Sequence, residues 1–226
     1  MASTPLANPA WHALGNRQSH FNIGGDLLRY FPADMSPFVG LPTWNEAERE
    51  LMKTELPADR TWFVMLEPKV IIPDVFQVKV TMPLYQMVCE ELKPVPPSTI
   101  FQPLTEDHVP QMLELTALTR PGPFSKDTIA FGNYVGIFDG DQLIAMGGER
   151  LQVPGYTEVS AICTHPDHQG RQLATQILSH VSQGILNRGE TPFLHTKTDN
   201  TAALRVYEKL GYRKSRDIFF AIIARK

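Results

Sequence analysis

The sequence of 226 residues predicts an α/β protein, in an α+β arrangement of one mixed sheet with helices on its faces. From residue 100 onward, strand-like and helical segments follow one another in the order β-α-α-β-β-β-α-β-α-β. Before residue 90 lies a shorter α+β set, and the proline-rich run EELKPVPPST (90–99) separates the two parts. We therefore predict an N-terminal region, residues 1–93, of unknown role and a larger domain, residues 94–226.

Two strands and one helix are predicted in the N-terminal region. The run TWNEAERELMKTEL (43–56) has helical composition with a partial apolar stripe. The runs TWFVMLE (61–67) and VFQVKVTM (75–82) have the composition of strands, and the second alternates apolar and polar residues. No functional pattern is recognisable in this region.

The larger domain begins with a strand, two helices and a hairpin. IFQPL (100–104) is a predicted short strand, and Thr105 is expected to cap the helix that follows it. After the turn-rich loop TRPGPFS (119–125), KDTIAFG (126–132) is a candidate short helix. YVGIFDGDQLIAMGGERL (134–151) reads as a hairpin, because two apolar runs flank an Asp-Gly turn.

The last elements alternate strand and helix. TEVSAICT (157–164) is a predicted strand, a helix is expected from about Gln172 to Arg188, and Gly189 suits a helix C-terminus. PFLHTKT (192–198) follows as a strand, NTAALRVYEKLG (200–211) as a helix, and RDIFFAIIA (216–224) as a final strand. This alternation completes the predicted mixed sheet.

Composition narrows the classes of partner and location. The formal net charge of −3 argues against nucleic acid or an anionic membrane as the main partner. Two cysteines cannot form a disulfide framework, and no run approaches the ~18 apolar residues of a membrane span. The N-terminus also lacks the pattern of a secretory leader. We therefore expect a cytoplasmic protein.

The stretch CTHPDHQGRQLATQIL (163–178) joins a strand to a helix through a polar turn. Unpaired N–H groups of a first helical turn converge, and the helix dipole adds partial positive charge. Gly170 permits close approach of the backbone, and the Arg171 side chain offers a charge-assisted bond to a phosphate. The turn therefore suits a pyrophosphate, although many α/β proteins have such a turn without a ligand.

Within this stretch, HQGRQLA (168–174) resembles the coenzyme A motif Q/R-x-x-G-x-G/A of the GNAT N-acetyltransferases. A strand with an acidic residue, Glu158, precedes it, and a long amphipathic helix follows. TDNTAALRVYEKLGY (198–212) resembles the second motif of the same superfamily. The resemblance covers residues 100–226 and looks closest to the branch similar to glycine N-acyltransferases, whose N-terminal half is often degenerate.

The resemblance implies acetyl-CoA as cosubstrate and a pantetheine arm that adds to the splayed strand before the motif. The implied coenzyme-binding residues lie on that strand, in the turn and at the start of the next helix: Ile162, Cys163, Thr164, Gln169, Gly170, Arg171, Gln172, Leu173, Ala174, Asn200 and Ala203. Asn200 equally suits a plain helix cap. Gln172 departs from the motif, which has glycine there. We expect Gln172 to have helical φ/ψ, since a positive φ would strain it.

Acyl transfer to an amine needs a group that removes a proton and a group that supplies one. Glu158 is the candidate base, directly or through a water, with a pKa raised by partial burial; the alternative is a solvated carboxylate. Tyr207 is the candidate acid, carried over from the motif phrase; the alternative is an ordinary helix aromatic. An N–H near Ala161 or Ile162 is expected to polarise the thioester carbonyl.

Candidate acceptor-binding residues are Arg120 and Phe124 in the 119–125 loop and Ser160, which shares a strand face with Glu158. Arg120 offers a partner for a substrate carboxylate, although loop arginines are usually solvated. The spacing Cys163-x-His165-x-x-His168 fits no standard zinc pattern, so no metal is expected and Cys163 reads as apolar filling.

The leading hypothesis is direct transfer of an acetyl group from acetyl-CoA to a primary amine, a small molecule or an amino acid. Two alternatives remain open: a regulatory module that binds acetyl-CoA without turnover, and a protein N-acetyltransferase. A homodimer is possible on this reading, and nucleic acid or membrane partners are not expected. Residues 1–93 are expected either to shape the acceptor pocket or to form a dimer surface.

Overall fold

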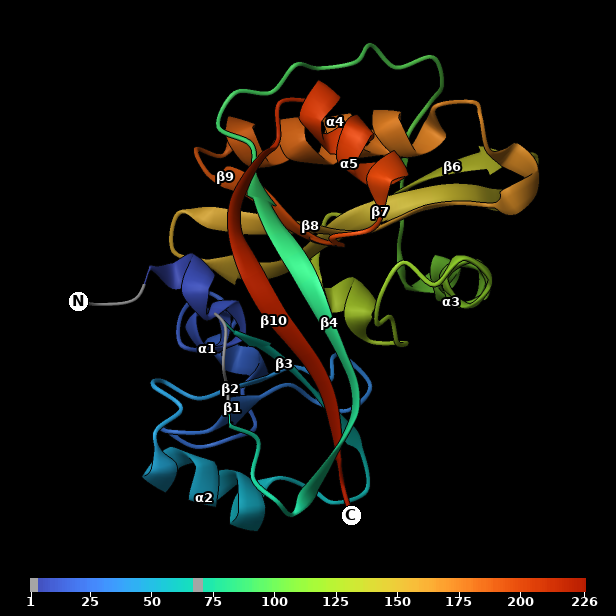
Figure 1. Ribbon diagram of the computed structural model, residues 1–226. Helices are drawn as coiled ribbons and strands as arrows, with labels where there is room; N and C mark the ends of the chain where they lie inside the picture. The colour runs from blue at the N-terminus through green and yellow to red at the C-terminus, as the bar shows by residue number, and fades with distance from the viewer. Residues whose placement is uncertain (1–3, 67–70) are drawn as a thin grey trace.

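The computed structural model describes residues 4–66 and 71–226, and its centre is an eight-stranded sheet (Figure 1). The strands of this sheet, in their order across it, are β3 (Thr61–Leu66), β10 (Arg213–Arg225), β4 (Phe76–Val88), β9 (Thr191–Lys197), β8 (Tyr156–Thr164), β7 (Gln142–Val153), β6 (Val135–Asp139) and β5 (Gln102–Pro103). Neighbours are antiparallel except β8 and β9, which are parallel. The predicted mixed sheet is confirmed.

The remaining elements lie around this sheet. The α-helices are α1 (Pro9–Leu14), α2 (Glu46–Glu55), α3 (Val109–Thr119), α4 (Leu173–Asn187) and α5 (Thr201–Lys209). A separate two-stranded sheet pairs β1 (Arg29–Tyr30) with β2 (Val39–Gly40). Short 3-10 helices span Pro5–Ala7, Ser19–Phe21, Glu106–His108, Thr128–Phe131 and Pro166–His168.

Most predicted elements occur, with different lengths. The strand expected at 75–82 extends to Val88, because β10 pairs with it from Phe76 to Val88. The strand expected at 61–67 ends its described part at Leu66, and Glu67 lies outside the described residues. The short helix expected at 126–132 is a single 3-10 turn. Thr105 caps the 3-10 turn that leads into α3.

Residues on both sides of the predicted division at 93 and 94 share the central sheet. Strand β4 lies between β9 and β10, and β3 pairs with the other edge of β10 (Figure 1). The proline-rich run falls in the loop from β4 to β5, where Val95 N–H donates to Ser179 Oγ at 3.0 Å and Ser98 N–H to Gln176 Oε1 at 2.7 Å. The run therefore packs on α4.

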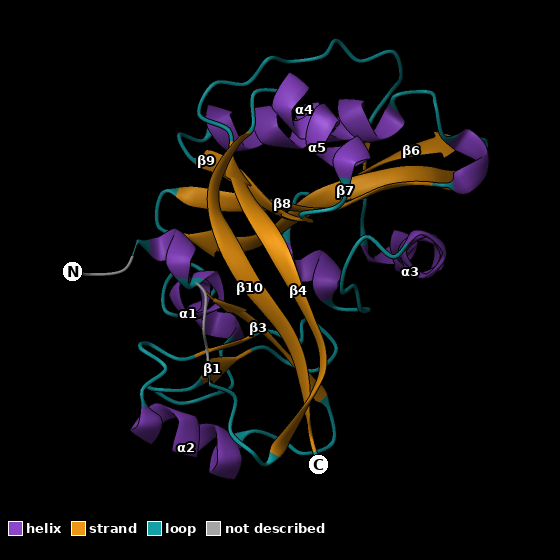
Figure 2. Ribbon diagram, in the orientation of Figure 1, coloured by secondary structure: helices purple, strands orange, loops and turns teal. Residues whose placement is uncertain are grey.

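Helices cover both faces of the sheet (Figure 2). Ile144 of β7 packs in one cluster with the apolar stripe of α4, whereas Leu143 and Met146 pack with α3 on the opposite face. On β8, Val159 faces α4, but Ala161 faces α3 although strict alternation would place both on one face. An irregularity in β8 therefore lies between these residues. Among the described residues, no helix is long and apolar enough to cross a membrane.

Candidate active site

A cavity of about 1120 Å³ opens where β8 and β9 separate. The two parallel strands pair only at their first residues, from Tyr156 opposite Thr191 to Glu158 opposite Phe193. Beyond this point β9 continues along β4, while β8 continues along β7. The cavity runs from the N-terminus of α4, which we call the coenzyme end, to side chains of β3, β4 and β10, which we call the acceptor end.

The coenzyme end is built from the turn between β8 and α4. Gln169, Gly170, Gln172, Leu173 and Ala174 line the cavity there. No side chain caps the N-terminus of α4, so the first N–H groups of this 15-residue helix keep their capacity to bind an anion. Gly170 has φ +77°, and nothing lies within 4 Å of where its Cβ would be, which leaves the backbone open to a ligand.

The expectation that Gln172 has helical φ/ψ is wrong. Gln172 is the N-cap residue of α4 with φ 58° and ψ 18°, in the left-handed region. A residue with a Cβ is strained there by about 1 kcal/mol, because the Cβ approaches the following carbonyl oxygen. The motif glycine is therefore replaced at a position whose backbone favours glycine.

The residues of this end suit a diphosphate with an attached pantetheine arm. Ile162, Cys163 and Thr164 line the cavity along the free side of β8. Thr164 Oγ1 is buried and has no hydrogen-bond partner among the described residues. Buried hydroxyls are almost always hydrogen-bonded, so this atom is consistent with a partner supplied by a ligand. The chain thus offers main-chain donors for phosphate and a polar strand edge for the arm.

Other predicted coenzyme residues have different neighbours. Arg171 Nη1 lies 2.8 Å from His168 Nδ1, and Arg171 does not line the cavity. Asn200 Oδ1 accepts from the N–H of Ala203 at 3.2 Å, so Asn200 caps α5 and also lines the cavity. Ala203 lies outside the cavity lining.

Tyr207, on α5, lines the middle of the cavity. Burial raises the pKa of its hydroxyl, and a hydrogen bond with Thr196 lowers it by a smaller amount. The phenol therefore stays protonated at neutral pH. Its hydrogen bond with Thr196 places the hydroxyl beside β9, beyond the last residue pair that joins β9 to β8.

The irregularity in β8 is a β-bulge at Ala161 and Ile162. Cys163 pairs with Met146 and Ser160 with Gly148, so two residues of β8 oppose Gly147 alone. Ala161 has φ 56°, which is unusual for a residue with a Cβ. A bulge interrupts the ladder and re-aims local groups. Because the extra residue reverses the alternation of side chains along β8, Ala161 and Cys163 share a face with Glu158 rather than with Val159.

Glu158 lies beneath the cavity in a buried polar cluster with Arg150 and His195. Its side chain is 0% exposed; Arg150 Nε and Nη2 donate to its two oxygens at 2.9 and 2.7 Å. His195 Nδ1 lies 2.7 Å from Glu158 Oε1. Burial raises the pKa of Glu158, but Arg150 and His195 together lower it more, to about 2. The expectation of a raised pKa is therefore wrong, because the sequence did not reveal these partners.

Gln86 on β4 determines which ring nitrogen of His195 carries the proton. Gln86 Nε2 donates to the carbonyl oxygen of Leu6 at 2.8 Å, and the same nitrogen lies 3.0 Å from His195 Nε2. An amide nitrogen only donates, so His195 Nε2 is the acceptor and Nδ1 carries the proton that is donated to Glu158. The imidazole is neutral in this arrangement. Gln86 Oε1 is left without a partner among the described residues.

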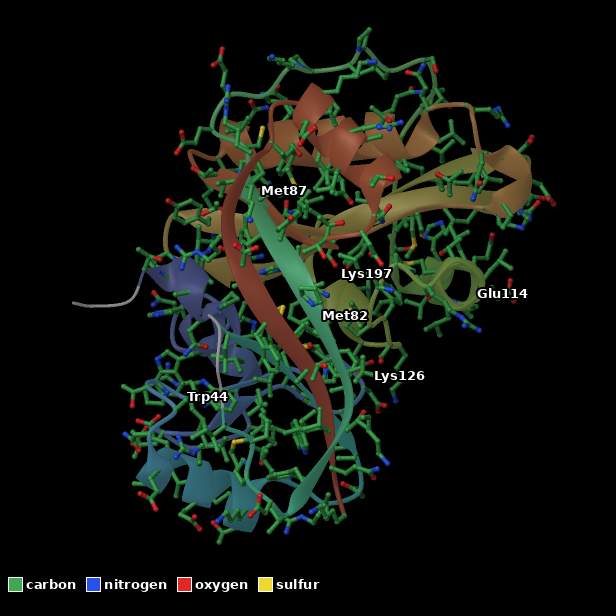
Figure 3. All side chains as sticks on the ribbon, in the orientation of Figure 1. Trp44, Met82, Met87, Glu114, Lys126 and Lys197 are labelled. Carbon is green, nitrogen blue, oxygen red and sulfur yellow. The ribbon has the colours of Figure 1, made fainter. Side chains whose placement is uncertain are left out.

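The acceptor end is apolar, and most of its residues come from the N-terminal region, for which shaping the acceptor pocket is one of the two expected roles; its individual residues are not predicted from the sequence. Its lining residues come from widely separated parts of the chain: Phe38, Phe63, Met65, Met82, Leu84, Phe220 and Ile222. Arg150 and His195 also line the cavity, and the Arg150 guanidinium lies 4.9 Å from the ring centre of Phe38. Lys197 of β9 stands opposite Leu84 (Figure 3 labels Met82 and Lys197). No local motif marks these residues, since each is an ordinary apolar strand or loop position.

The predicted acceptor residues are partly brought to this site. Arg120 ends α3 with φ 50° and lines the cavity, exposed at its mouth. Phe124 packs edge-on against Tyr134 at 5.7 Å and, like Ser160, does not line the cavity. Cys163 is buried, and burial raises the pKa of its thiol to about 11, in keeping with apolar filling.

Comparison with known proteins points to one family. The model of the FR47-like protein family matches residues 134–221. N-alpha-acetyltransferase RimI of Mycobacterium tuberculosis is 32% identical over 98 residues, which is 42% of this chain and 61% of that protein. The uncharacterized N-acetyltransferase YobR of Bacillus subtilis is 30% identical over 77 residues, 34% of this chain and 31% of that protein. The chain thus spans less than two thirds of either curated relative.

A solved structure covers the whole chain. It is described as an acetyltransferase of the GNAT family from Novosphingobium aromaticivorans, with 31% identity and a TM-score of 0.90. The match covers 99% of this chain and 100% of that one, so the N-terminal region is included in the likeness. The separation of β8 from β9 and the uncapped N-terminus of α4 agree with this likeness. The matches show that the chain belongs to the GNAT family of acetyltransferases.

Proposed function

We propose that the protein is an N-acetyltransferase that moves an acetyl group from acetyl-CoA to a primary amine by direct attack. One observation carries the proposal: a single cavity joins the open N-terminus of α4, the free side of β8 and Tyr207 to an apolar pocket. This is the arrangement required to hold a thioester and an amine in contact. The bound coenzyme supplies the thioester carbonyl that the amine attacks.

The turn and β8 hold the coenzyme in this proposal. Main-chain N–H groups from Gly170 to Ala174 bind the diphosphate, where the helix dipole favours negative charge. Residues 162–164 offer backbone and hydroxyl groups to the pantetheine amides. The bulge at Ala161 provides an N–H for the developing oxyanion, and such a donor typically contributes 10²–10³-fold in rate.

Tyr207 supplies the proton for the leaving thiolate. The amine nitrogen forms the new C–N bond, the C–S bond breaks, and the sulfur takes the phenolic proton. Tyr207 is protonated at neutral pH because burial raises its pKa. The nitrogen loses two protons in all, one of which replaces the tyrosine proton while the other leaves to solvent.

Glu158 acts through His195 in this proposal rather than as the base itself. Its carboxylate is held ionised by Arg150, and a weak base of that kind removes a proton from an ammonium poorly. The neutral His195 lines the cavity and is oriented by Glu158, as a histidine base is by its carboxylate partner. His195 Nε2 takes a proton only after the Gln86 N–H that donates to it has moved away, because Gln86 Nε2 is also held by the carbonyl oxygen of Leu6.

Two classes of amine are candidate acceptors. The resemblance of residues 164–212 to the glycine N-acyltransferase-like branch points to a small amine or amino acid. The Mycobacterium tuberculosis relative is named for acetylation of α-amines, so a peptide N-terminus is the second acceptor class. The alternative function is a module that binds acetyl-CoA without turnover, and a protonated Tyr207 in the cavity lining supports catalysis over it.

The test is thiol release from acetyl-CoA in the presence of a panel of primary amines, run beside calorimetric titration of acetyl-CoA. We expect binding and amine-dependent release of the thiol. Binding without release by any amine or peptide would support the non-catalytic module instead. Absence of acetyl-CoA binding would remove the proposed function altogether.

A further inference from the structure

The guanidinium of Arg150 presents one unpaired edge to the acceptor end. Its Nε and Nη2 atoms are both used by Glu158, whereas Nη1 has no acceptor among the described residues. A Cβ placed on Gly122 would lie 3.8 Å from Nη1, so this nitrogen points toward the 119–125 loop at the cavity mouth. Arg150 is only 8% exposed. Nη1 is not among the side-chain atoms that are buried without a partner, so it is open to the cavity that Arg150 lines, where an oxygen of a ligand can replace water as its acceptor.

The cluster that presents this edge carries no net charge. The positive charge of Arg150 is balanced by the ionised Glu158, and His195 is neutral as fixed by Gln86. A carboxylate bound at Nη1 would bring a second negative charge close to Glu158 in a poorly hydrated site. A neutral carbonyl oxygen accepts the same hydrogen bond without that cost. The other cations that line the cavity, Arg120 and Lys197, are exposed.

Aromatic rings stand beside this donor. Phe38 and Phe63 meet edge-on with ring centres 5.9 Å apart, and Phe63 meets Phe220 edge-on at 5.2 Å. The Arg150 guanidinium lies over Phe38, 4.9 Å from the ring centre. The described residues that line the cavity include no aspartate or glutamate, so the wall offers nothing to a polycationic amine. It favours an apolar or aromatic group at van der Waals contact.

We propose that the acceptor is a primary amine whose α-carbon carries both an aromatic or bulky apolar group and a neutral carbonyl, as in an aromatic amino acid amide, ester or peptide N-terminus. Arg150 Nη1 donates to the carbonyl oxygen, and Phe38, Phe63 and Phe220 contact the side group. This inference rests on the proposed acetyl transfer and adds the chemistry that selects the acceptor.

Four amines separate the parts of the inference: phenylalaninamide, phenethylamine without the carbonyl, glycinamide without the ring, and phenylalanine with a carboxylate. Thiol release is measured for each as kcat/KM per concentration of neutral amine, because the four amino groups differ in pKa. We expect phenylalaninamide to exceed each of the other three by about tenfold, the effect of one lost hydrogen bond to a charged donor or of an empty apolar pocket.

Variants test whether Arg150 makes the selection. Arg150→Lys keeps the charge opposite Glu158 but loses the fork of donors. We expect the ratio of kcat/KM for phenylalaninamide over phenethylamine to fall about tenfold, with the KM for acetyl-CoA unchanged. Damage to the fold lowers both rates and leaves their ratio intact. Arg213→Lys, at an exposed position, is the matched control for Arg150→Lys. If Arg150→Lys does not fold, Phe63→Leu tests the aromatic wall by the ratio of kcat/KM for phenylalaninamide over that for glycinamide.

The outcomes distinguish this inference from the proposed function. Transfer to phenethylamine or glycinamide as fast as to phenylalaninamide overturns the selection while leaving acetyl transfer intact. A higher kcat/KM for phenylalanine than for phenylalaninamide overturns the requirement for a neutral carbonyl, because the site would then recognise the charge of a carboxylate. Failure of acetyl-CoA to bind the wild-type protein sinks the proposed function itself.

Discussion

The two ends of the cavity are built in opposite ways. The coenzyme end is made by consecutive residues of one turn, and its main contribution is backbone: open N–H groups at α4 and left-handed residues at 170 and 172. The acceptor end is made by side chains from β3, β4, β7, β9 and β10, held by a buried ion pair. In the proposed function, binding of the coenzyme therefore depends on local conformation, whereas binding of the acceptor depends on packing between distant segments.

This contrast predicts where substitutions are most costly. A backbone site tolerates most side chains, so changes at the coenzyme end are expected to alter stability by about 1 kcal/mol or less. A buried ion pair does not tolerate loss of one partner, because the remaining charge stays in a poorly hydrated place. The acceptor end is therefore expected to give the largest effects.

Glu158→Gln is expected to have the largest effect on stability. It leaves the guanidinium of Arg150 buried without its counter-charge, which costs about 3–5 kcal/mol in free energy of unfolding. Denaturant unfolding at neutral pH measures this cost. Glu149→Gln is the matched control, because Glu149 is also buried but its partner Arg188 is 38% exposed and regains water. An equal loss in free energy of unfolding for both variants would mean that the burial of Arg150 does not increase the cost of removing its partner.

The cost of Glu158→Gln also depends on pH. The pKa of Glu158 is lowered from its ordinary value of 4.5 to about 2 in the folded protein. A lowered pKa stabilises the folded state above the unfolded value, by ~3 kcal/mol here, and this contribution is lost as the pH falls from about 4.5 to 2. The difference in stability between wild type and variant should shrink over that range. A difference that stays constant would show that Glu158 is not ionised in the folded protein.

Tyr207→Phe is expected to have the next largest effect, on rate rather than on folding. Loss of the phenolic proton donor should lower kcat about 10²-fold, with little change in the KM for acetyl-CoA. Tyr212→Phe is the matched control: its ring centre lies 6.1 Å from that of Tyr207, and its hydroxyl contacts Ser182 rather than the cavity. Steady-state kinetics of both variants decide the matter. Wild-type kcat in Tyr207→Phe would leave Tyr207 as a packing residue.

The same contrast explains how much of the molecule the sequence predicts. The coenzyme end was visible because its signals are local: a strand, a glycine, and a helix with a regular apolar face within sixteen residues. The order of strands and helices was visible for the same reason, since apolar periodicity is a local property. The boundaries were predicted less well: the strand expected at 75–82 runs to Val88, and the strand expected at 100–104 is reduced to Gln102–Pro103.

The sequence offers the N-terminal region as one candidate for the acceptor pocket, but the individual residues were not predictable, because they depend on register and on distant pairing. Arg150 and Glu158 lie on adjacent strands, and His195 is 37 residues beyond Glu158, so only the sheet brings them together. Phe63 reaches the cavity because β3 pairs with β10, and Phe38 is placed beside it by an isolated parallel β-bridge between the two residues. The left-handed conformation of Gln172 was also missed, because glutamine gives no sign of a positive φ.

Gly170→Ala tests the backbone character of the coenzyme end. The residue has φ +77°, and an added Cβ meets nothing within 4 Å, so the cost is conformational rather than steric. We expect a loss of about 1 kcal/mol in free energy of unfolding, read from thermal or denaturant transitions. Gly140→Ala is a control of the same kind, since Gly140 also has a positive φ and an open surround but lies in the β6–β7 turn. Only Gly170→Ala should also weaken acetyl-CoA binding. Equal affinities of the two variants for acetyl-CoA would show that residue 170 does not contribute to the phosphate site.

Gln172→Gly should give the smallest change, and in the opposite direction. Glycine removes the strain of φ 58°, while its greater freedom in the unfolded chain offsets part of the gain, so we expect stabilisation by about 0.5 kcal/mol. If the diphosphate is held by the backbone, calorimetry should show acetyl-CoA affinity equal to wild type or tighter. A marked loss of affinity would mean that the glutamine side chain itself contacts the coenzyme, and the coenzyme end would then depend on side chains as the acceptor end does.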